Sequence, residues 1–334
     1  MLFWSLWAIL ARVEPDKVRY VALNKTIFIL AGAVFTGLVF PELSEWFAPA
    51  LYPSLFCIML FTLVPIDVVA LIKQFRALAP LSLAMVAVQM ILMPLLVWAL
   101  IVWINPNWPY AHYVFVTVCA GSIFGAPAFV RLLGIDDSIA LLGVVFSTLL
   151  LPLSLPIMMR LMDGVFAVHG ITEISFAALN FTEYGARLLI YIALPLVVSI
   201  LYHEIVKRYV NNQTRVVYWC KALVTIALVI FAIAVMDGVT PLFFQRPAHV
   251  TMLFFWVMVV HIALFILPFV LFRYLGNDAA ISAGMLSSYR NLGLVVAICG
   301  QFLSDEFLIF VGLWQIPMYL SPLVLSFVFA PNKG

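Results

Sequence analysis

Long apolar runs divide this sequence and fix the solvent in which it can fold. Each run is about twenty residues long, enough to cross a hydrocarbon core of about 30 Å as a helix. The chain is 66% hydrophobic and 10% charged, whereas a soluble domain carries roughly 25% charged residues. Water cannot accommodate so much apolar surface, so we expect an integral membrane protein whose partner is the lipid bilayer.

The runs predict an all-α membrane protein with about ten transmembrane helices. All of them fit a single membrane domain over residues 1–334, with residues 1–20 lying at the interface as an amphipathic segment. The expected spans are residues 26–40, 49–69, 79–104, 110–133, 138–160, 185–204, 217–236, 249–275, 279–301 and 306–330.

Basic residues orient these spans through the positive-inside rule. With the N-terminus in the cytoplasm, about thirteen of the 17 Lys and Arg residues fall on the cytoplasmic side. Only Arg160, Arg187 and Arg246 fall on the other side, and Arg290 lies inside a predicted span. We therefore expect both termini in the cytoplasm, and the compact loops favour a bacterial inner membrane.

The longest polar connection, roughly Asp163 to Arg187, separates two groups of five spans. An odd number of spans makes the second group enter the membrane from the opposite side. The sequence thus predicts two inverted repeats, at about residues 24–161 and 184–330, which is a pattern of many secondary transporters.

The fourth span and the ninth are both interrupted. The fourth reads CAGSIFGAPAFVRLLG and includes Gly121, Gly125 and Pro127, while the ninth reads GMLSSYRNLGLVVAICG. Gly and Pro break helical hydrogen bonding, and bare amides are tolerated at membrane depth only inside protein or beside a wet cavity. Simple kinks are the alternative. Two breaks at matching positions favour crossing helices that form a binding site.

Arg290 is the most informative single residue. A guanidinium at mid-span costs between about 3 and 17 kcal/mol unless it is solvated or paired. We expect it to face a cavity and an anionic ligand; a neighbouring carbonyl is the alternative partner. Mid-span Gln89 is a second candidate for the site; the alternative is that it only holds two helices together. The predicted substrate-binding residues are Gln89, Ser122, Gly125, Pro127, Ser287, Ser288, Arg290 and Asn291.

Other polar side chains are expected to be structural. Ser147 and Thr148 are expected to bond their own helix, and His261 to pack as a neutral imidazole or, alternatively, to relay protons. No CxxC pair or metal-ligand spacing is present, so neither a cofactor nor a metal is expected. The histidines are scattered, which argues against an enzyme, and nothing points to nucleic acid. The cysteines are Cys57, Cys119, Cys220 and Cys299.

Three stretches resemble the bile acid:sodium symporter family, within the bile acid–arsenite–riboflavin transporter superfamily. They are CAGSIFGAPAFVRLLGIDDSIALLGVVFSTLLLPLSLPIM, SSYRNLGLVVAI and VQMILMPLL. The resemblance implies ten spans in two inverted repeats, and panel and core subdomains that move against each other. It also implies unwound fourth and ninth spans behind the substrate cavity, and uptake of a small organic anion coupled to sodium.

The sequence departs from that family at the sodium ligands. Gly125 and Ala126 stand where the family has a Ser-Asn pair, and Ala140, Val144 and Leu286 replace oxygen ligands. Only Gln89 is retained as an ion-binding candidate. Because a hard cation needs several oxygen ligands, we hypothesise that Arg290 supplies the positive charge that sodium brings elsewhere. The coupling ion is then a proton or none.

Three alternatives are kept. The first alternative is a sodium-coupled symporter with unusual ligands. The second is an arsenite- or auxin-type efflux carrier in which Cys119 is a soft ligand. The third alternative is a membrane sensor that keeps the carrier fold without transport.

Overall fold

The computed structural model describes residues 28–67, 70–71, 73, 76–105, 107–168, 181–204, 213–300 and 303–329. Within these residues the chain is almost entirely helical, and the one extended pairing is an isolated bridge at the centre of the molecule. The interfacial segment predicted for residues 1–20 lies outside the described residues.

Six helices in the described ranges are long and apolar enough to cross a bilayer, which makes the chain a multi-pass all-α membrane protein. They are Pro41–Leu63, Ala79–Ile104, Ser138–Gly164, Thr182–Glu204, Val216–Gln245 and Pro247–Leu275. Their segments are α3 (Pro41–Phe47), η1 (Ala48–Ala50), α4 (Leu51–Leu63), α6 (Ala79–Ala87), η2 (Val88–Leu92), α7 (Met93–Ile104), α10 (Ser138–Val168), α11 (Phe181–Leu188), η4 (Leu189–Ala193), α12 (Leu194–Glu204), α13 (Gln213–Ala234), α14 (Val239–Gln245), α15 (Pro247–Phe272) and η6 (Arg273–Leu275).

The other four expected spans take different forms, so the six spanning helices of the described chain fall short of the ten expected. The first is only a short apolar helix, Phe28–Val39. The fourth and ninth are each split into two short helices, and the tenth is α18 (Asp305–Phe329). The second expected span also begins earlier, at Pro41 rather than at residue 49, because proline suits the first turn of a helix.

Prolines leave carbonyl groups without their helical donors, and nearby hydroxyl groups replace those donors. Pro41 has no N–H for the carbonyl of Gly37, which accepts a bond from Ser44 Oγ at 3.3 Å. Pro156 likewise has none for the carbonyl of Pro152, which accepts from Tyr184 Oη at 3.1 Å. In a membrane such carbonyls must be satisfied inside the protein, so these bonds fix where the kinked helices meet.

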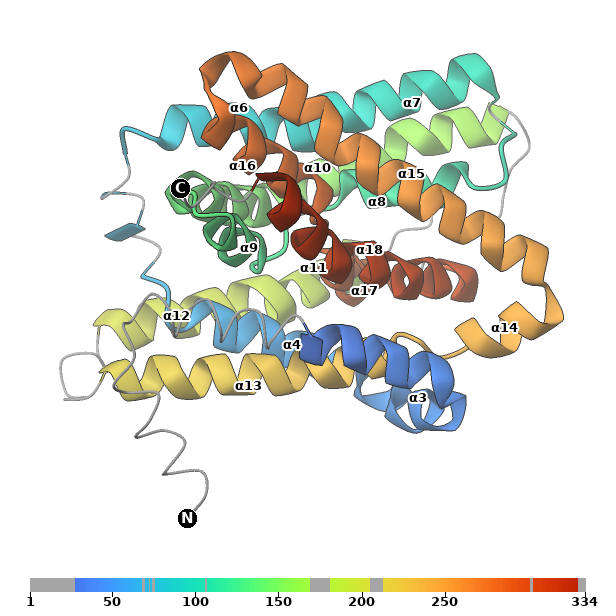
Figure 1. The fold of residues 1–334 in the computed structure, drawn as a ribbon, viewed down its shortest axis with the longest axis horizontal. Helices are drawn as coiled ribbons and strands as arrows, with labels where there is room; N and C mark the ends of the chain where they lie inside the picture. The colour runs from blue at the N-terminus through green and yellow to red at the C-terminus, as the bar shows by residue number, and fades with distance from the viewer. Residues whose placement is uncertain are drawn as a thin grey trace.

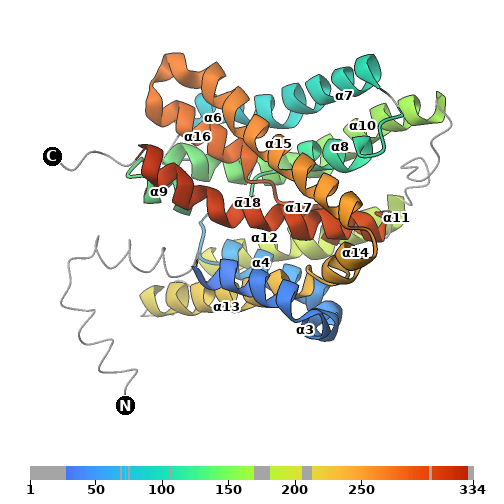
Figure 2. The ribbon, with the colours of Figure 1, turned by 45° about the vertical axis from the view of Figure 1, so that its right-hand side comes forward.

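The helices form two layers with α17 (Leu292–Cys299) between them. Figure 1 shows α4, α12 and α13 side by side in one layer, and α6, α7, α10 and α15 in the other; Figure 2 shows the same division. The helix α17 contacts α4 and α11 of the first layer, and it also contacts α18, which packs on α15 of the second layer. Arg187 Nη1 of α11 donates to the carbonyl of Ala297 in α17 at 3.1 Å, which ties α11 to the helix between the layers.

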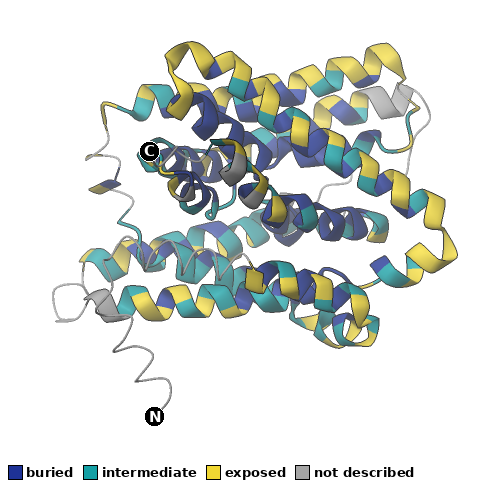
Figure 3. Cartoon of the chain, in the orientation of Figure 1, coloured by how far each residue is buried: buried dark blue, intermediate teal, exposed yellow. Residues whose placement is uncertain are grey.

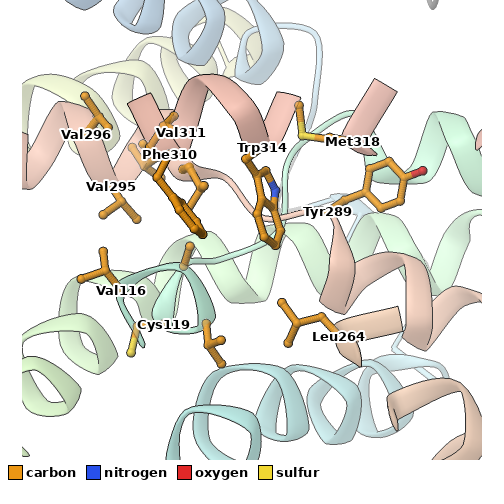
Figure 4. Packing of buried hydrophobic residues seen from close by; sticks show 14 of the residues in the cluster. Val116, Cys119, Leu264, Tyr289, Val295, Val296, Phe310, Val311, Trp314 and Met318 are labelled. Atoms are coloured by element: carbon orange, nitrogen blue, oxygen red, sulfur yellow. The ribbon is translucent and has the colours of Figure 1, made fainter. Parts of the chain in front are cut away.

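Buried and exposed residues separate as a bilayer demands. The buried interior includes Phe310, Trp314 and Tyr289 (Figure 4), whereas the outward faces of α7, α13 and α15 are exposed and apolar (Figure 3). Trp103 and Tyr274 lie near helix ends and are 85% and 80% exposed. Such residues gather at the two membrane–water interfaces.

Gly312→Ala is expected to lower the thermal unfolding temperature in detergent. A Cβ at this position would lie 2.7 Å from the backbone oxygen of Val235, which cannot rotate away. Overpacking of this kind costs about 1–3 kcal/mol. The control is Gly32→Ala, where no atom lies within 4 Å of the added Cβ and no loss is expected. Equal unfolding temperatures for the two variants would contradict the packing of α18 on the chain that follows α13.

Candidate functional site

Two interrupted helices meet at the centre of the molecule. The helix α8 (Ala111–Cys119) stops before an extended Ala120, and α9 (Ala126–Leu132) follows after the break. Similarly, α16 (Asn277–Ser288) stops and α17 begins at Leu292. Both breaks predicted from the sequence are therefore present, at the Gly-rich and polar stretches that the pattern indicated.

The two breaks pair with each other as an antiparallel bridge between Ser122 and Arg290. The N–H of Ile123 donates to the carbonyl of Tyr289 at 2.9 Å, and the N–H of Asn291 donates to the carbonyl of Gly121 at 2.7 Å. This is the non-hydrogen-bonded type of pair, in which the two opposed residues come closest. The bridge satisfies backbone groups that hydrocarbon would leave bare.

The guanidinium of Arg290 lies behind this bridge and is 1% exposed. Its Nη1 donates to the carbonyl of Ala120 at 2.6 Å, and both Nη1 and Nη2 lie 3.3 Å from the backbone carbonyl of Gln89. Nη2 also donates to Ser287 Oγ at 3.3 Å. One side chain thus joins α16, the end of α8 and the interrupted part of a third helix.

The carbonyl of Gln89 is free to accept these bonds because of the local sequence. Residues Val88–Leu92 form a π-helical turn in which the N–H of Met93 donates to Val88 instead of Gln89. The next residue, Pro94, has no N–H at all. The carbonyl of Gln89 therefore loses both possible backbone donors, and the guanidinium of Arg290 takes their place.

Helix ends, rather than a carboxylate, balance the charge of Arg290. No ion pair joins it to an acidic side chain in the described part of the chain. Its partners instead include Ala120, which follows the last turn of α8, and Ser287, in the last turn of α16. The C-terminus of a helix carries a partial negative charge, so two such ends converge on one cation.

The side chain of Gln89 extends this network to Ser122. Ser122 Oγ donates to the carbonyl of Leu286 at 2.5 Å and lies 3.0 Å from the Gln89 amide. With the amide turned so that its nitrogen donates to Ser122 Oγ, its oxygen accepts from Arg290 Nη1 at 3.2 Å and from the Ser122 N–H at 3.1 Å. That orientation pairs both the nitrogen and the oxygen of the Gln89 amide, and amide orientation is assigned from such networks.

The predicted site residues fall into two groups. Gln89, Ser122, Ser287 and Arg290 contact one another as described, whereas the others act locally. Ser288 Oγ bonds the carbonyl of Gly284 in its own helix, and Asn291 Oδ1 caps α17 by accepting from the N–H of Leu294. The start of α9 is formed by Gly125, as its N-cap, and by Pro127 in its first turn.

Three groups that form hydrogen bonds to Arg290 or Ser122 were not predicted from the sequence. The carbonyls of Ala120 and Leu286 carry no side-chain signal. Ser147 was expected to bond only its own helix, yet besides bonding the carbonyl of Val144 its Oγ accepts from the N–H of Ser122 at 3.2 Å. Pro94 was the one sign in the sequence that the backbone carbonyl of Gln89 would lack a helical donor.

Two cavities lie near the layer boundary. The larger has a volume of about 330 Å³ and an apolar lining that includes Leu38, Phe243 and Ile316. The smaller lies between α4, α10 and α12 and is lined by Phe124 of the first break and by Thr148. The hydroxyl of Thr148 is buried and has no partner among the described residues.

Gln89→Leu is expected to destabilise the protein by about 1–3 kcal/mol, because it leaves buried donors of Ser122 and Arg290 with fewer partners. Gln315→Leu is the matched control. Gln315 is equally buried, but its amide bonds only its own helix, at 3.3 Å, and its oxygen has no partner in the described chain. Chemical unfolding followed by tryptophan fluorescence measures both. Equal losses of unfolding free energy in the two variants would contradict the claim that Gln89 supports Ser122 and Arg290.

No protein-family model matches the chain, and no curated protein matches it either. The resemblance to bile acid:sodium symporters therefore stays a prediction based on three short stretches of sequence. What bears on function is the geometry itself: two interrupted helices, paired through Ser122 and Arg290, with a buried guanidinium that lacks a carboxylate partner in the described residues.

Proposed function

We propose that this chain is a secondary transporter of a small organic anion, resembling bile acid:sodium symporters. Its cation is Arg290, and its transport does not depend on sodium. The observation that supports this most directly is the buried guanidinium of Arg290 at the crossing of two interrupted helices. Half-helix ends at mid-membrane are where many secondary transporters bind their substrates.

The proposal includes ten membrane passages in two inverted repeats, with panel and core subdomains. The order of elements supports it, because an interrupted helix is the fourth helical passage in each half. The first half comprises Phe28–Val39, Pro41–Leu63, Ala79–Ile104, α8 with α9, and α10. The second comprises Thr182–Glu204, Val216–Gln245, Pro247–Leu275, α16 with α17, and α18.

Hydrocarbon at the expected ion-ligand positions supports sodium independence. Ala140, Val144 and Leu286 are buried, and the side chain of Leu286 lies against Gly143. These side chains offer no oxygen to a hard cation. The guanidinium meanwhile bonds the carbonyls of Ala120 and Gln89, as a bound metal cation would.

Organic anions are expected to stabilise the purified protein equally in sodium and choline buffers. A ligand at 100 times its Kd adds about 2.7 kcal/mol to the stability of the folded state, which a thermal unfolding scan detects. Arg290→Gln is expected to lose this response, whereas Arg246→Gln, which removes an exposed cation elsewhere, is expected to keep it. Stabilisation that requires sodium would identify an ordinary sodium symporter with unusual ligands.

Flux into proteoliposomes separates a carrier from a sensor. A carrier exchanges labelled anion across the membrane, whereas a sensor binds it without flux.

Stabilisation by arsenite that is lost in Cys119→Ser would instead favour the efflux-carrier alternative, because Cys119 ends α8 beside this crossing.

Arg290→Lys separates charge from geometry. Lysine keeps the positive charge, but one ammonium cannot reproduce a planar fork that reaches Ala120, Gln89 and Ser287. We expect a lower unfolding temperature than wild type but a retained response to anions. A variant as stable as wild type that has lost the anion response would contradict the proposed role of the charge.

A further inference from the structure

A second set of hydrogen-bonded side chains lies in the interior beside the bridge, on the other side of the chain from Arg290. It consists of His261, Ser321 and Tyr289. His261 of α15 lies with its Nε2 3.2 Å from Ser321 Oγ of α18, and Ser321 Oγ lies 2.7 Å from Tyr289 Oη. His261 is 4% exposed and Tyr289 is fully buried. Tyr289 also supplies the carbonyl that pairs with Ile123 in the bridge. The imidazole is therefore connected to the crossing through two hydroxyl groups.

One nitrogen of the imidazole is unused within the described residues. Its Nδ1 is buried without a partner in the part of the chain that the structure describes. Aromatic rings enclose it, with the Trp314 ring centroid at 5.4 Å and that of Tyr289 at 5.8 Å. No ion pair joins the imidazole to a charged side chain among the described residues.

The ionisable residues on α15 and on the elements packed against it lie mostly at helix ends. His249 on α15 and Arg273, the first residue of η6, are each twelve residues from His261, or about 18 Å along the axis. The elements packed against α15 are α8, α14, α16, α18 and η6, and α14 carries no ionisable residue. Those of the other elements are His112, Tyr113, Cys119, Tyr274, Asp278, Asp305, Glu306 and Tyr319.

We propose that His261 is a proton-binding site, and that the carrier moves a proton together with its anion. In the neutral state Nε2 accepts from the Ser321 hydroxyl, which in turn accepts from Tyr289. Once a proton is bound, Nε2–H donates to Ser321 and Ser321 donates to Tyr289, so the direction of the hydrogen-bond chain reverses and the hydroxyl proton of Tyr289 turns away from Ser321. Histidine relays of this kind inside membranes mark proton pathways.

The chain of hydroxyl groups also explains how proton and anion are linked. The imidazole contacts the Tyr289 ring, with centroids 5.8 Å apart, and Tyr289 directly precedes Arg290. A proton on His261 therefore adds a second positive charge to a crossing whose cation lacks a carboxylate partner in the described residues. A bound anion compensates both charges. Proton and anion then favour each other's binding by the same factor, as linkage requires. This inference rests on the proposed carrier function and names its coupling ion.

The test uses alkyl sulfonates, which keep their negative charge throughout the pH range. The affinity of the most stabilising one, from methanesulfonate to octanesulfonate, is measured by thermal shift at pH 5.5 and 7.5. Wild type is expected to bind roughly tenfold more tightly at pH 5.5, as linkage of one proton allows. His261→Gln keeps a hydrogen-bonding group but takes up no proton, so its affinity should change less than twofold. His249→Gln, the same substitution on the same helix, should behave as wild type. An unchanged pH dependence in His261→Gln overturns the proposal while leaving the anion carrier intact.

Two further measurements separate failure of this inference from failure of the carrier. In proteoliposomes containing a pH-sensitive dye, addition of the sulfonate should acidify the lumen with wild type and not with His261→Gln. Should no sulfonate bind, the anion carrier itself fails for this class. His261 is then tested alone, through the fluorescence of the adjacent Trp314 titrated from pH 4 to 9. A transition present in wild type and absent from His261→Gln supports proton binding, and identical titrations overturn it.

Discussion

Backbone carbonyls that have lost their helical donors are the constraint on which this structure depends. Prolines, a π-helical turn and two broken helices create them, and lipid cannot satisfy them. Ser44 satisfies the carbonyl of Gly37, and Tyr184 satisfies that of Pro152. At the centre the same requirement is met by Arg290, whose planar fork bonds the carbonyls of Gln89 and Ala120 together. The kinks that bend the helices and the contacts that join them thus have one origin.

Arg290 differs from the hydroxyl groups because it also brings a charge. A buried cation without a carboxylate partner is costly unless dipoles replace the water it has lost. Here the C-terminal ends of α8 and α16 converge on it, and the carbonyl freed by Pro94 completes the set. A cation held in this way polarises the crossing without an added ion, which is the physical basis of the proposed sodium independence. On the other side of the bridge, hydrogen bonds join Tyr289, Ser321 and His261, the proposed proton-binding site.

The sequence predicted the membrane class and both helix breaks, because apolar runs, Gly and Pro are local signals. Arg290 was expected to face a cavity, but its partners here include backbone carbonyls, which was the alternative. The pairing of Ser122 with Arg290 was not predictable, since it depends on how distant segments dock. Nor was the role of backbone carbonyls such as that of Leu286, which no side chain reveals. Fewer continuous spanning helices are present in the described residues than expected, because the helix before Pro41 is short and because the fourth and ninth runs are each broken into two helices. Whether the eight predicted site residues bind an anion stays a prediction.

Hydrogen exchange at the amides of Ile123 and Asn291 tests the central claim most directly. Both amides bond across the bridge, at 2.9 and 2.7 Å, and exchange requires that bridge to open. The account predicts strong protection of peptides covering residues 121–123 and 289–291 in wild type. In Arg290→Gln that protection should be lost, while α13 stays as protected as before. If the peptides remain protected in the variant, the crossing does not depend on the guanidinium, and Arg290 is not the residue that holds this fold together.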